Sequence, residues 1–139
     1  MPLLSLSGER PSNLGVHDGE LAACPNSPNC VSSDATGRVH RIEALHLEAS
    51  PQQAWSAARS AVEAIARTRV ITATDDYLHA ECTSALMGYV DDLELHLRPE
   101  ADLIAVRSAS RLGYGDMGVN RRRVEDLRKQ LRKTGTIGS

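Results

Sequence analysis

The chain has 139 residues, a length that predicts one domain with a core of its own. Aromatic side chains make up 3% of it, so stacking on single-stranded nucleic acid is poorly supported and nucleic acid is not an expected partner. The formal net charge of −2 hides an uneven distribution, because acids dominate residues 75–102 whereas residues 121–133 carry seven basic side chains.

Residues 1–38 are rich in proline and glycine, which predicts an irregular N-terminal arm that lies on the body of the protein. No basic region precedes an apolar run in this segment, and no stretch of the chain approaches the roughly 18 apolar residues of a membrane span. We therefore expect no membrane span and a cytoplasmic location. Residues 39–139 form the expected body, within one domain overall.

The body begins with an alternating stretch, residues 39–47, that predicts a strand. Ser50 then offers an N-cap, and Pro51 follows at the first helical position. Apolar residues recur at helical spacing beyond this point, so we expect a helix over residues 51–66.

Four further strands are predicted over residues 69–74, 77–84, 90–98 and 102–111, joined by short turns into an antiparallel meander. A last helix is expected to begin with Asn120 as its N-cap, and it carries a narrow apolar stripe. The order β-α-β-β-β-β-α predicts an α+β fold. We expect an antiparallel sheet of four to five strands, with both helices on one face.

The sheet face opposite the core is unusually charged. Its predicted members are His79, Glu81, Asp92, Glu94, Arg107 and Arg111. Ladders of opposite charge on neighbouring strands are most often ion pairs on a solvated face, and that is our expectation. A polar ligand-binding surface and a face covered by the N-terminal arm are the alternatives.

Asp91 is expected on the core side of its strand, beside Leu93, because adjacent residues of a strand point to opposite faces. Asp91 and Asp92 therefore cannot share one acid/base site. An inward carboxylate needs a partner, which an arginine of the terminal helix or the amides at its start could supply.

The cysteines give no clear reaction. Cys24 and Cys30 lie in a loop restricted by two prolines, where their Cα atoms can approach to disulfide distance. A disulfide-closed loop is the leading interpretation, two unpaired thiols are the alternative, and the usual zinc spacing is absent. Cys82 is expected in the core. No motif for a metal or cofactor is recognised, so a non-enzymatic protein is favoured.

The segment from Arg107 to Arg123 is the most informative one, with five arginines and three glycines where a strand turns into a helix. Such a turn can bind an anion through its arginines and free helix amides. It can also build a rigid corner in which nearby carboxylates, such as that of Asp116, neutralise the arginines.

Several motifs appear in a characteristic order, namely Gly19-Glu20-Leu21, Cys24 to Ser33, Tyr77 to Glu81, Val90 to Asp92 and Arg107 to Arg121. Over about residues 12–133 this set resembles the domain-of-unknown-function 1499 family. The resemblance implies no established activity that could be carried over. The matching motif positions are Cys24, Cys30, Ser33, Asp92, Arg107, Ser108, Ser110, Arg111, Asp116, Asn120 and Arg121.

We expect the motifs to meet at one polar corner made of Ser33, Asp91, Asp92, Arg107, Ser108, Ser110, Arg111, Asp116, Asn120 and Arg121. The leading hypothesis is a non-enzymatic binding or assembly module whose corner holds an anionic small molecule or a lipid head group. An enzyme that uses Cys24 or Cys30 with Asp92 and Arg107 is one alternative. A purely structural ion-pair corner, with the basic helix 120–133 as the surface for a protein complex, is the other.

Overall fold

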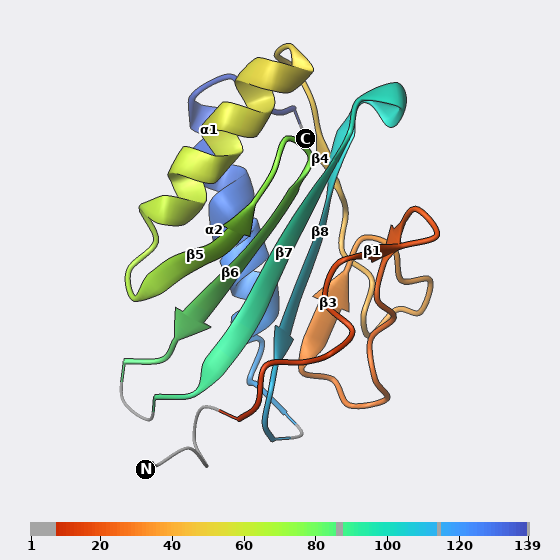
Figure 1. The fold of residues 1–139 in the computed structure, drawn as a ribbon, viewed down its shortest axis with the longest axis vertical. Helices are drawn as coiled ribbons and strands as arrows, with labels where there is room; N and C mark the ends of the chain where they lie inside the picture. Colours follow the sequence, from red (N-terminus) through yellow and green to blue (C-terminus); the bar gives the residue numbers. More distant parts are fainter. Residues whose placement is uncertain (1–7, 86–87, 114, 139) are drawn as a thin grey trace.

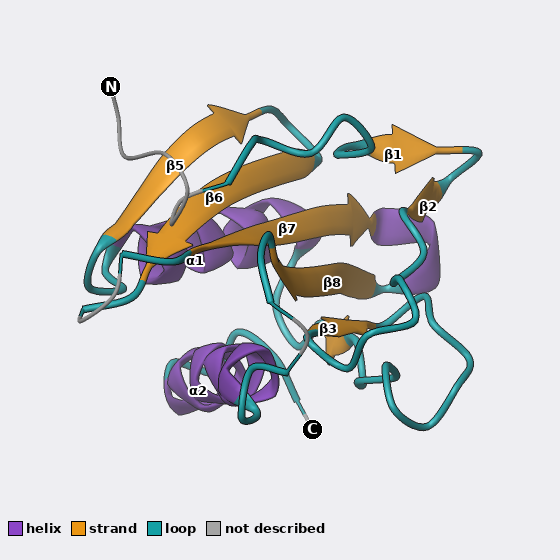
Figure 2. Cartoon of the chain, turned by 90° about the horizontal axis from the view of Figure 1, so that it is seen from below, coloured by secondary structure: helices purple, strands orange, loops and turns teal. Residues whose placement is uncertain are grey.

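The computed structural model describes residues 8–85, 88–113 and 115–138, so the extreme ends of the expected arm and body lie outside the described residues. Over these ranges, two helices cover one face of a six-stranded antiparallel sheet (Figures 1 and 2). The strands follow the spatial order β3-β8-β7-β6-β5, and β4 pairs with the other end of β8. The expected α+β class with both helices on one face is confirmed.

The bounds of the elements agree with most of the expected ones. The main sheet contains β3 (Cys30–Ser32), β4 (Leu45–His46), β5 (Thr68–Ala73), β6 (Tyr77–Thr83), β7 (Val90–Arg98) and β8 (Leu103–Ser110). A separate hairpin is formed by β1 (Val16–His17) and β2 (Glu20–Leu21), and the helices are α1 (Pro51–Glu63) and α2 (Val119–Lys133). The four strands of the meander are therefore confirmed within one residue at each end.

The expected strand over residues 39–47 is wrong for most of its length. Two residues of it pair with β8, and the amides of His40 and Arg41 instead bond to the carbonyl of Gly37 in a turn. Val39 is 59% exposed and contributes nothing to the core. Alternation alone did not reveal that this stretch bends back toward β3.

The N-terminal arm is not merely laid on the body, because it supplies β3, an edge of the main sheet. Val31 lies opposite Ser108 and Ser32 lies opposite Arg107 in an antiparallel pairing with β8. The sheet thus has six strands where the sequence predicted four to five. Three residues of the expected arm are part of the framework that positions the candidate site.

Helix α1 begins as predicted, since the hydroxyl of Ser50 accepts a hydrogen bond from the amide of Gln53 at 3.3 Å. It ends at Glu63, three residues earlier than expected. Its buried face packs on the sheet, and the indole of Trp55 donates to the carbonyl of Thr74 at 2.9 Å. That bond joins the first turns of α1 to the end of β5.

Helix α2 begins one residue before Asn120, with Gly118 in the left-handed conformation as its N-cap. The carboxylate of Asp116 accepts hydrogen bonds from the amides of Gly118 at 2.8 Å and Asn120 at 3.2 Å. The expected Asn120 cap is therefore wrong, because Asp116 provides the capping oxygen atoms and leaves the side chain of Asn120 for other contacts. The predicted apolar stripe is confirmed and is buried at Val124, Leu127 and Leu131.

Aliphatic side chains fill the space between the sheet and the helices. Cys82 is buried among them, as predicted. The opposite face of the sheet carries the charged side chains, and most of them are buried, so the alternative of a face covered by the arm holds in place of the expected solvated face. The arm covers this face (Figure 2). No helix within the described ranges is long and apolar enough to cross a bilayer.

Candidate functional site

The sheet separates the candidate residues into two polar clusters, so they do not meet at one corner. Asp92, Arg107 and Arg111 lie on the face covered by the arm, and we call this group with its neighbours the arm-side cluster. Asp91, Ser108 and Ser110 belong to the face covered by the helices, and Asp116 and Asn120 join them there as the helix-side cluster. The alternation of side chains along β8 is the reason, because Arg107 and Ser108 point to opposite faces.

Arg111 is the centre of the arm-side cluster. Its guanidinium donates two hydrogen bonds of 2.8 Å to the two carboxylate oxygen atoms of Asp92 and a third to Glu81. The ring of His79 lies 2.7 Å from the carboxylate of Asp92, and Arg10 of the arm also binds Glu81. These contacts form a buried network of ion pairs that joins three strands to the arm.

The ion pairs of this network shift the pKa values of its members toward their charged forms. Burial alone would raise the pKa of Asp92, but the bonds from Arg111 and His79 outweigh it and hold this pKa below its ordinary value. The pKa of Glu81 is lowered in the same way, against burial, by Arg111 and Arg10. The bond to Asp92 is the main cause that raises the pKa of Arg111. All three groups are therefore charged at neutral pH.

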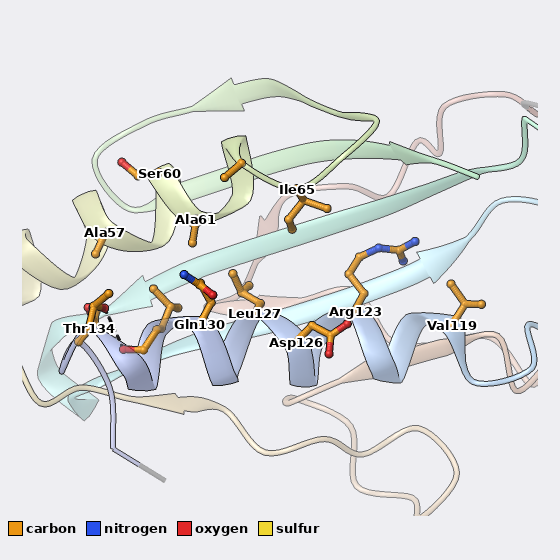
Figure 3. Close-up of a pocket in the computed structure, with 13 residues that line it drawn as sticks. Ala57, Ser60, Ala61, Ile65, Val119, Arg123, Asp126, Leu127, Gln130 and Thr134 are labelled. Atoms are coloured by element: carbon orange, nitrogen blue, oxygen red, sulfur yellow. Dashed lines mark hydrogen bonds between the residues drawn. The ribbon is translucent and has the colours of Figure 1, made fainter. Parts of the chain in front are cut away.

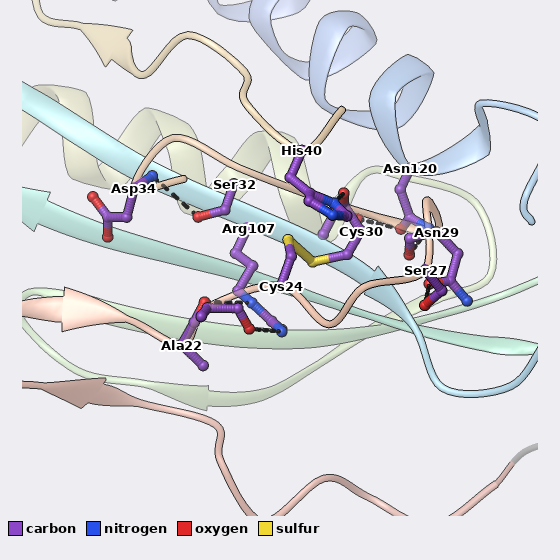
Figure 4. The surroundings of a disulfide bond; sticks show 12 residues. Ala22, Cys24, Ser27, Asn29, Cys30, Ser32, Asp34, His40, Arg107 and Asn120 are labelled. Carbon is purple, nitrogen blue, oxygen red and sulfur yellow. Dashed lines mark hydrogen bonds between the residues drawn. A yellow bond between two sulfur atoms is a disulfide. The ribbon is translucent and has the colours of Figure 1, made fainter. Parts of the chain in front are cut away.

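Arg107 has a different environment. Its Nε and Nη2 atoms donate to the carbonyls of Ala22 at 2.9 Å and Ala23 at 3.1 Å, as Figure 4 shows. Its Nη1 atom lies 3.7 Å from Oε1 of Glu94, which is longer than a hydrogen bond. Burial consequently lowers the pKa of Arg107. The second oxygen atom of Glu94 accepts from the hydroxyl of Tyr77 and from the amide of Gly15 at 2.8 Å.

A disulfide joins Cys24 and Cys30, with their Cα atoms 5.7 Å apart, which confirms the leading interpretation of this loop (Figure 4). Cys30 is buried in β3, so the disulfide holds the loop against the sheet beside Arg107. Cys82 lies on the helix-covered face, opposite to His79, and burial raises the pKa of its thiol. Cys24, Asp92 and Arg107, the residues named for the enzyme alternative, do line one hollow between the arm and the sheet, but Cys24 is held in the disulfide and presents no thiol there.

Asn120 is the centre of the helix-side cluster. Its amide group donates to Ser110 at 2.9 Å and to Asp116 at 2.8 Å, and its carbonyl oxygen accepts from Ser108 at 2.7 Å. The amide also reaches the backbone carbonyl of Asn29 at 3.2 Å. One side chain thereby connects α2, β8 and the disulfide loop.

Asp91 has the partner that its inward position required. Its carboxylate binds the guanidinium of Arg123, in the second turn of α2, at 2.8 Å. Arg123 also donates to Ser108 and Asn120. The prediction of an arginine from the terminal helix is confirmed, and this arginine is part of the site although the expected set did not name it.

The other expected contributors to an anion site are engaged elsewhere. Arg121 donates to the backbone carbonyls of Arg41 at 3.0 Å and Val39 at 3.1 Å, away from Arg107 and Arg111. The carboxylate of Asp116 accepts hydrogen bonds from backbone amides at the start of α2. Burial alone would raise the pKa of Asp116, but its hydrogen bonds outweigh burial and lower this pKa. The expected site of three arginines and free helix amides is therefore not assembled. The side-chain hydroxyl of Ser33 accepts a hydrogen bond from the backbone amide of Val106 at 2.9 Å, so it fastens the segment after β3 to β8.

One set of side chains has the residue types of a metal site. The ligand atoms of His79, Glu81 and Asp92 lie within 4.8 Å of one another. A cation at this point would compete with the guanidinium groups of Arg111 and Arg10, which already neutralise the two carboxylates. The donor set suits a hard or borderline metal, but the arginines fill the positions that the metal would need.

The hollows beside these clusters include two of different size. One, of about 440 Å³, lies between the arm and the sheet and is lined in part by Arg107 and Arg111. The larger one, the helix groove, encloses about 990 Å³ between α1 and α2 (Figure 3). Sequence reasoning missed the groove. The sequence feature that could have predicted it is a row of small residues on α1 and its C-cap, Ala57, Ala61 and Ala64, which leaves space beside α2.

The fold and the two clusters define a small α+β domain in which a disulfide-fastened arm seals a charged sheet face and two helices cover the other. The particular family is then given by comparison. The chain belongs to the family described as Protein of unknown function (DUF1499), whose sequence profile matches residues 20–131, and this confirms the resemblance noted from the motifs. The comparison with curated proteins and with solved structures found no match.

Proposed function

We propose that this domain is a non-enzymatic binding module that holds a small, largely apolar molecule in the helix groove. The observation that carries the proposal is the size and lining of the groove. Its volume of about 990 Å³ is within the range of roughly 300–1,000 Å³ that ligand pockets occupy. A row of alanines on α1 faces aliphatic and polar side chains of α2 across it (Figure 3).

The charges around the groove favour a ligand whose buried part is neutral. Two charged residues line the groove, Arg123 and Asp126, and the guanidinium of Arg123 is bound to Asp91, Ser108 and Asn120. The cation is thus neutralised within the fold. Asp126 is an exposed carboxylate, which disfavours a second negative charge at this wall. An anionic group placed against this wall would lose water without gaining an unpaired positive charge.

Polar side chains lie along the same groove and can bind one end of the ligand. Ser60 of α1 and Gln130 of α2 are both exposed and line it, together with Thr134 just beyond α2. Hydroxyl and amide groups of this kind fix the orientation of a ligand whose body is apolar. The supported class is therefore a long neutral molecule with one uncharged polar end, such as a long-chain alcohol.

The test is binding of the neutral apolar dye Nile red, with a long-chain alcohol as competitor. We expect the dye to gain fluorescence on the wild-type protein and to be displaced by the alcohol. Ala61→Trp fills the groove and should weaken dye binding by about tenfold or more. Ser56→Trp places the same side chain on an exposed position of α1 that does not line the groove, and should leave binding unchanged.

The proposal fails if the wild-type protein does not bind the dye, or if Ala61→Trp binds it as tightly while melting cooperatively. Thermal unfolding of both variants separates a blocked groove from a damaged fold. A cytoplasmic location stays part of the proposal, and fractionation of cells tests it.

A second candidate function is the binding of an anionic group in the hollow between the arm and the sheet. The observation in its favour is Arg107, which is buried, lines this hollow and makes no hydrogen bond through Nη1 to any described residue. Inorganic phosphate should then raise the melting temperature of the wild type and have no effect on Arg107→Gln. Equal shifts in both proteins would remove this candidate.

A further inference from the structure

Four large apolar side chains are exposed at one end of the sheet. They are Tyr89 before β7, Leu112 and Met117 in the connection from β8 to α2, and Val119 at the start of α2, with exposures of 41%, 38%, 91% and 38%. Tyr89, Leu112 and Val119 also line one hollow of about 420 Å³, so the two segments lie side by side. We call these four residues the apolar tip. Figure 1 shows both connections at the same end of the molecule.

Clustering is what makes these residues informative, because single exposed apolar side chains are common on soluble proteins. Met117 is nearly fully exposed although its backbone is well fixed. It has a positive φ of 55°, and the turn that holds it is fastened by the carboxylate of Asp116, bound to the amides of Gly118 and Asn120. The chain thus keeps an apolar side chain directed into solvent.

The charges around the tip are of both signs, but they differ in whether a charged partner already binds them. Asp91 and Asp116 line the hollow of the tip, but each is already bound, Asp91 to Arg123 and Asp116 to the start of α2. Arg122 is exposed and lies against the tip, since its Nη1 atom donates to the carbonyl of Met117 at 2.9 Å. Asp116 keeps its negative charge, which the amides at the positive end of α2 offset in part. Arg121 and Arg122 at the start of α2 bind only backbone carbonyls among the described residues, so positive charge exceeds negative charge beside the apolar side chains.

We propose that the apolar tip docks on the surface of an anionic lipid bilayer. Met117 and Leu112 enter the interfacial region, Tyr89 lies at the level of the head groups, and Arg122 binds lipid phosphate. Aliphatic, aromatic and arginine side chains at one exposed tip match the three layers of such an interface. Negative lipids attract basic residues near the surface, which gives the preference for anionic bilayers.

The position of the tip connects docking to the helix groove. Val119 lines both the hollow of the tip and the groove, so the two hollows meet at the start of α2. A protein docked by the tip would present this end of the groove to the acyl chains. Docking itself depends on the tip alone, whereas the transfer of a ligand from the bilayer rests on the proposed function of the groove.

The test is cosedimentation of the full chain with vesicles. Mixed phosphatidylserine and phosphatidylcholine vesicles should bind the wild type about tenfold more strongly than pure phosphatidylcholine vesicles, and added salt should reduce the difference. Met117→Asp and Arg122→Glu should each lower binding by about tenfold. Ser56→Asp makes the same change of charge as Met117→Asp at an exposed position of α1 that lines neither hollow, and should bind like the wild type.

Absence of binding to either vesicle overturns the proposal, as does equal loss of binding in Met117→Asp and Ser56→Asp. Binding of a protein partner, with no vesicle binding, would also overturn it. The Ala61→Trp variant keeps the two proposals apart, because it should lose the dye and still sediment with anionic vesicles. A wild-type protein that binds vesicles but not the dye would remove the function of the groove and leave the docking in place.

Discussion

Replacing Arg111 with alanine is the sharpest test of the arm-side cluster. The side chain is buried and holds the two oxygen atoms of Asp92 at 2.8 Å, and it also binds Glu81. Without it, Asp92, which is 1% exposed, loses its guanidinium partner while still largely shielded from water. Its remaining charged neighbour is His79, at 2.7 Å.

Removing one partner of a buried ion pair costs about 3–5 kcal/mol. We expect the lower end of that range, about 3 kcal/mol, because His79 still binds Asp92 and Arg10 still binds Glu81. For a chain of this size, such a loss lowers the melting temperature by roughly 10 °C. The variant should therefore stay folded at room temperature and unfold at a clearly lower urea concentration.

Urea unfolding can be followed by the fluorescence of Trp55, which is the chain's sole tryptophan and is buried in the core. Arg59→Ala is the matched control, since Arg59 pairs with Glu63 one turn away on the exposed face of α1. The free energy of unfolding of Arg59→Ala should fall by less than about 0.5 kcal/mol. A free energy of unfolding for Arg111→Ala that equals the control's would refute the reasoning.

A second variant separates the ion pair from simple packing. Arg111→Met retains much of the side-chain volume but leaves Asp92 charged, and combining it with Asp92→Asn removes that charge. We expect the double variant to be more stable than Arg111→Met alone. If the charge of Asp92 has no role, the order will be reversed or absent.

Two further predictions concern the same region. Cys24→Ser opens the seven-residue disulfide loop of residues 24–30. The entropy of closing that loop predicts a loss of about 2 kcal/mol in the free energy of unfolding, and a reductant should cause the same loss in the wild type. A wild-type stability that does not depend on reductant would contradict this prediction. Stability should also fall in acid, because the pKa values of Glu81 and Asp92 are lower in the folded than in the unfolded protein. The contribution of these two carboxylates to the free energy of unfolding is complete above their pKa values in the unfolded protein, about 4. It is lost as the pH falls through their pKa values in the folded protein. Urea midpoints measured from neutral to acidic pH should show this decline, and it should be shallower in Arg111→Ala; identical slopes would count against the ion pairs.

Local patterns predicted the parts of this fold that depend on local chemistry. Alternation defined the meander, and the inward position of Asp91 predicted an arginine from the terminal helix, which is Arg123. The cap of α1 followed from Ser50 and Pro51 in the same way. Each of these features is decided by residues a few positions apart or by the period of one strand.

Features that depend on distant segments were not predicted. The charged face was expected to be solvated, and cover by the arm was named only as an alternative, since nothing in the strands shows that residues 71 to 85 positions earlier lie on it. The expected single corner failed for a simpler reason, because the alternation that separates Asp91 from Asp92 also separates Arg107 from Ser108. The helix groove escaped notice because space left by small side chains depends on the distance between two helices.

The contacts of the arm also determine the order in which the chain can reach its final structure. Residue 22 binds Arg107, so the ribosome must release β8 before the arm can settle on the sheet. Until then the uncovered face exposes mainly carboxylates and guanidinium groups, which water solvates well, and its apolar groups are small, such as those of Ala105 and Ala109. A late step of assembly is thereby protected from aggregation, since the surface left open longest during synthesis is the one with the least tendency to stick to other chains.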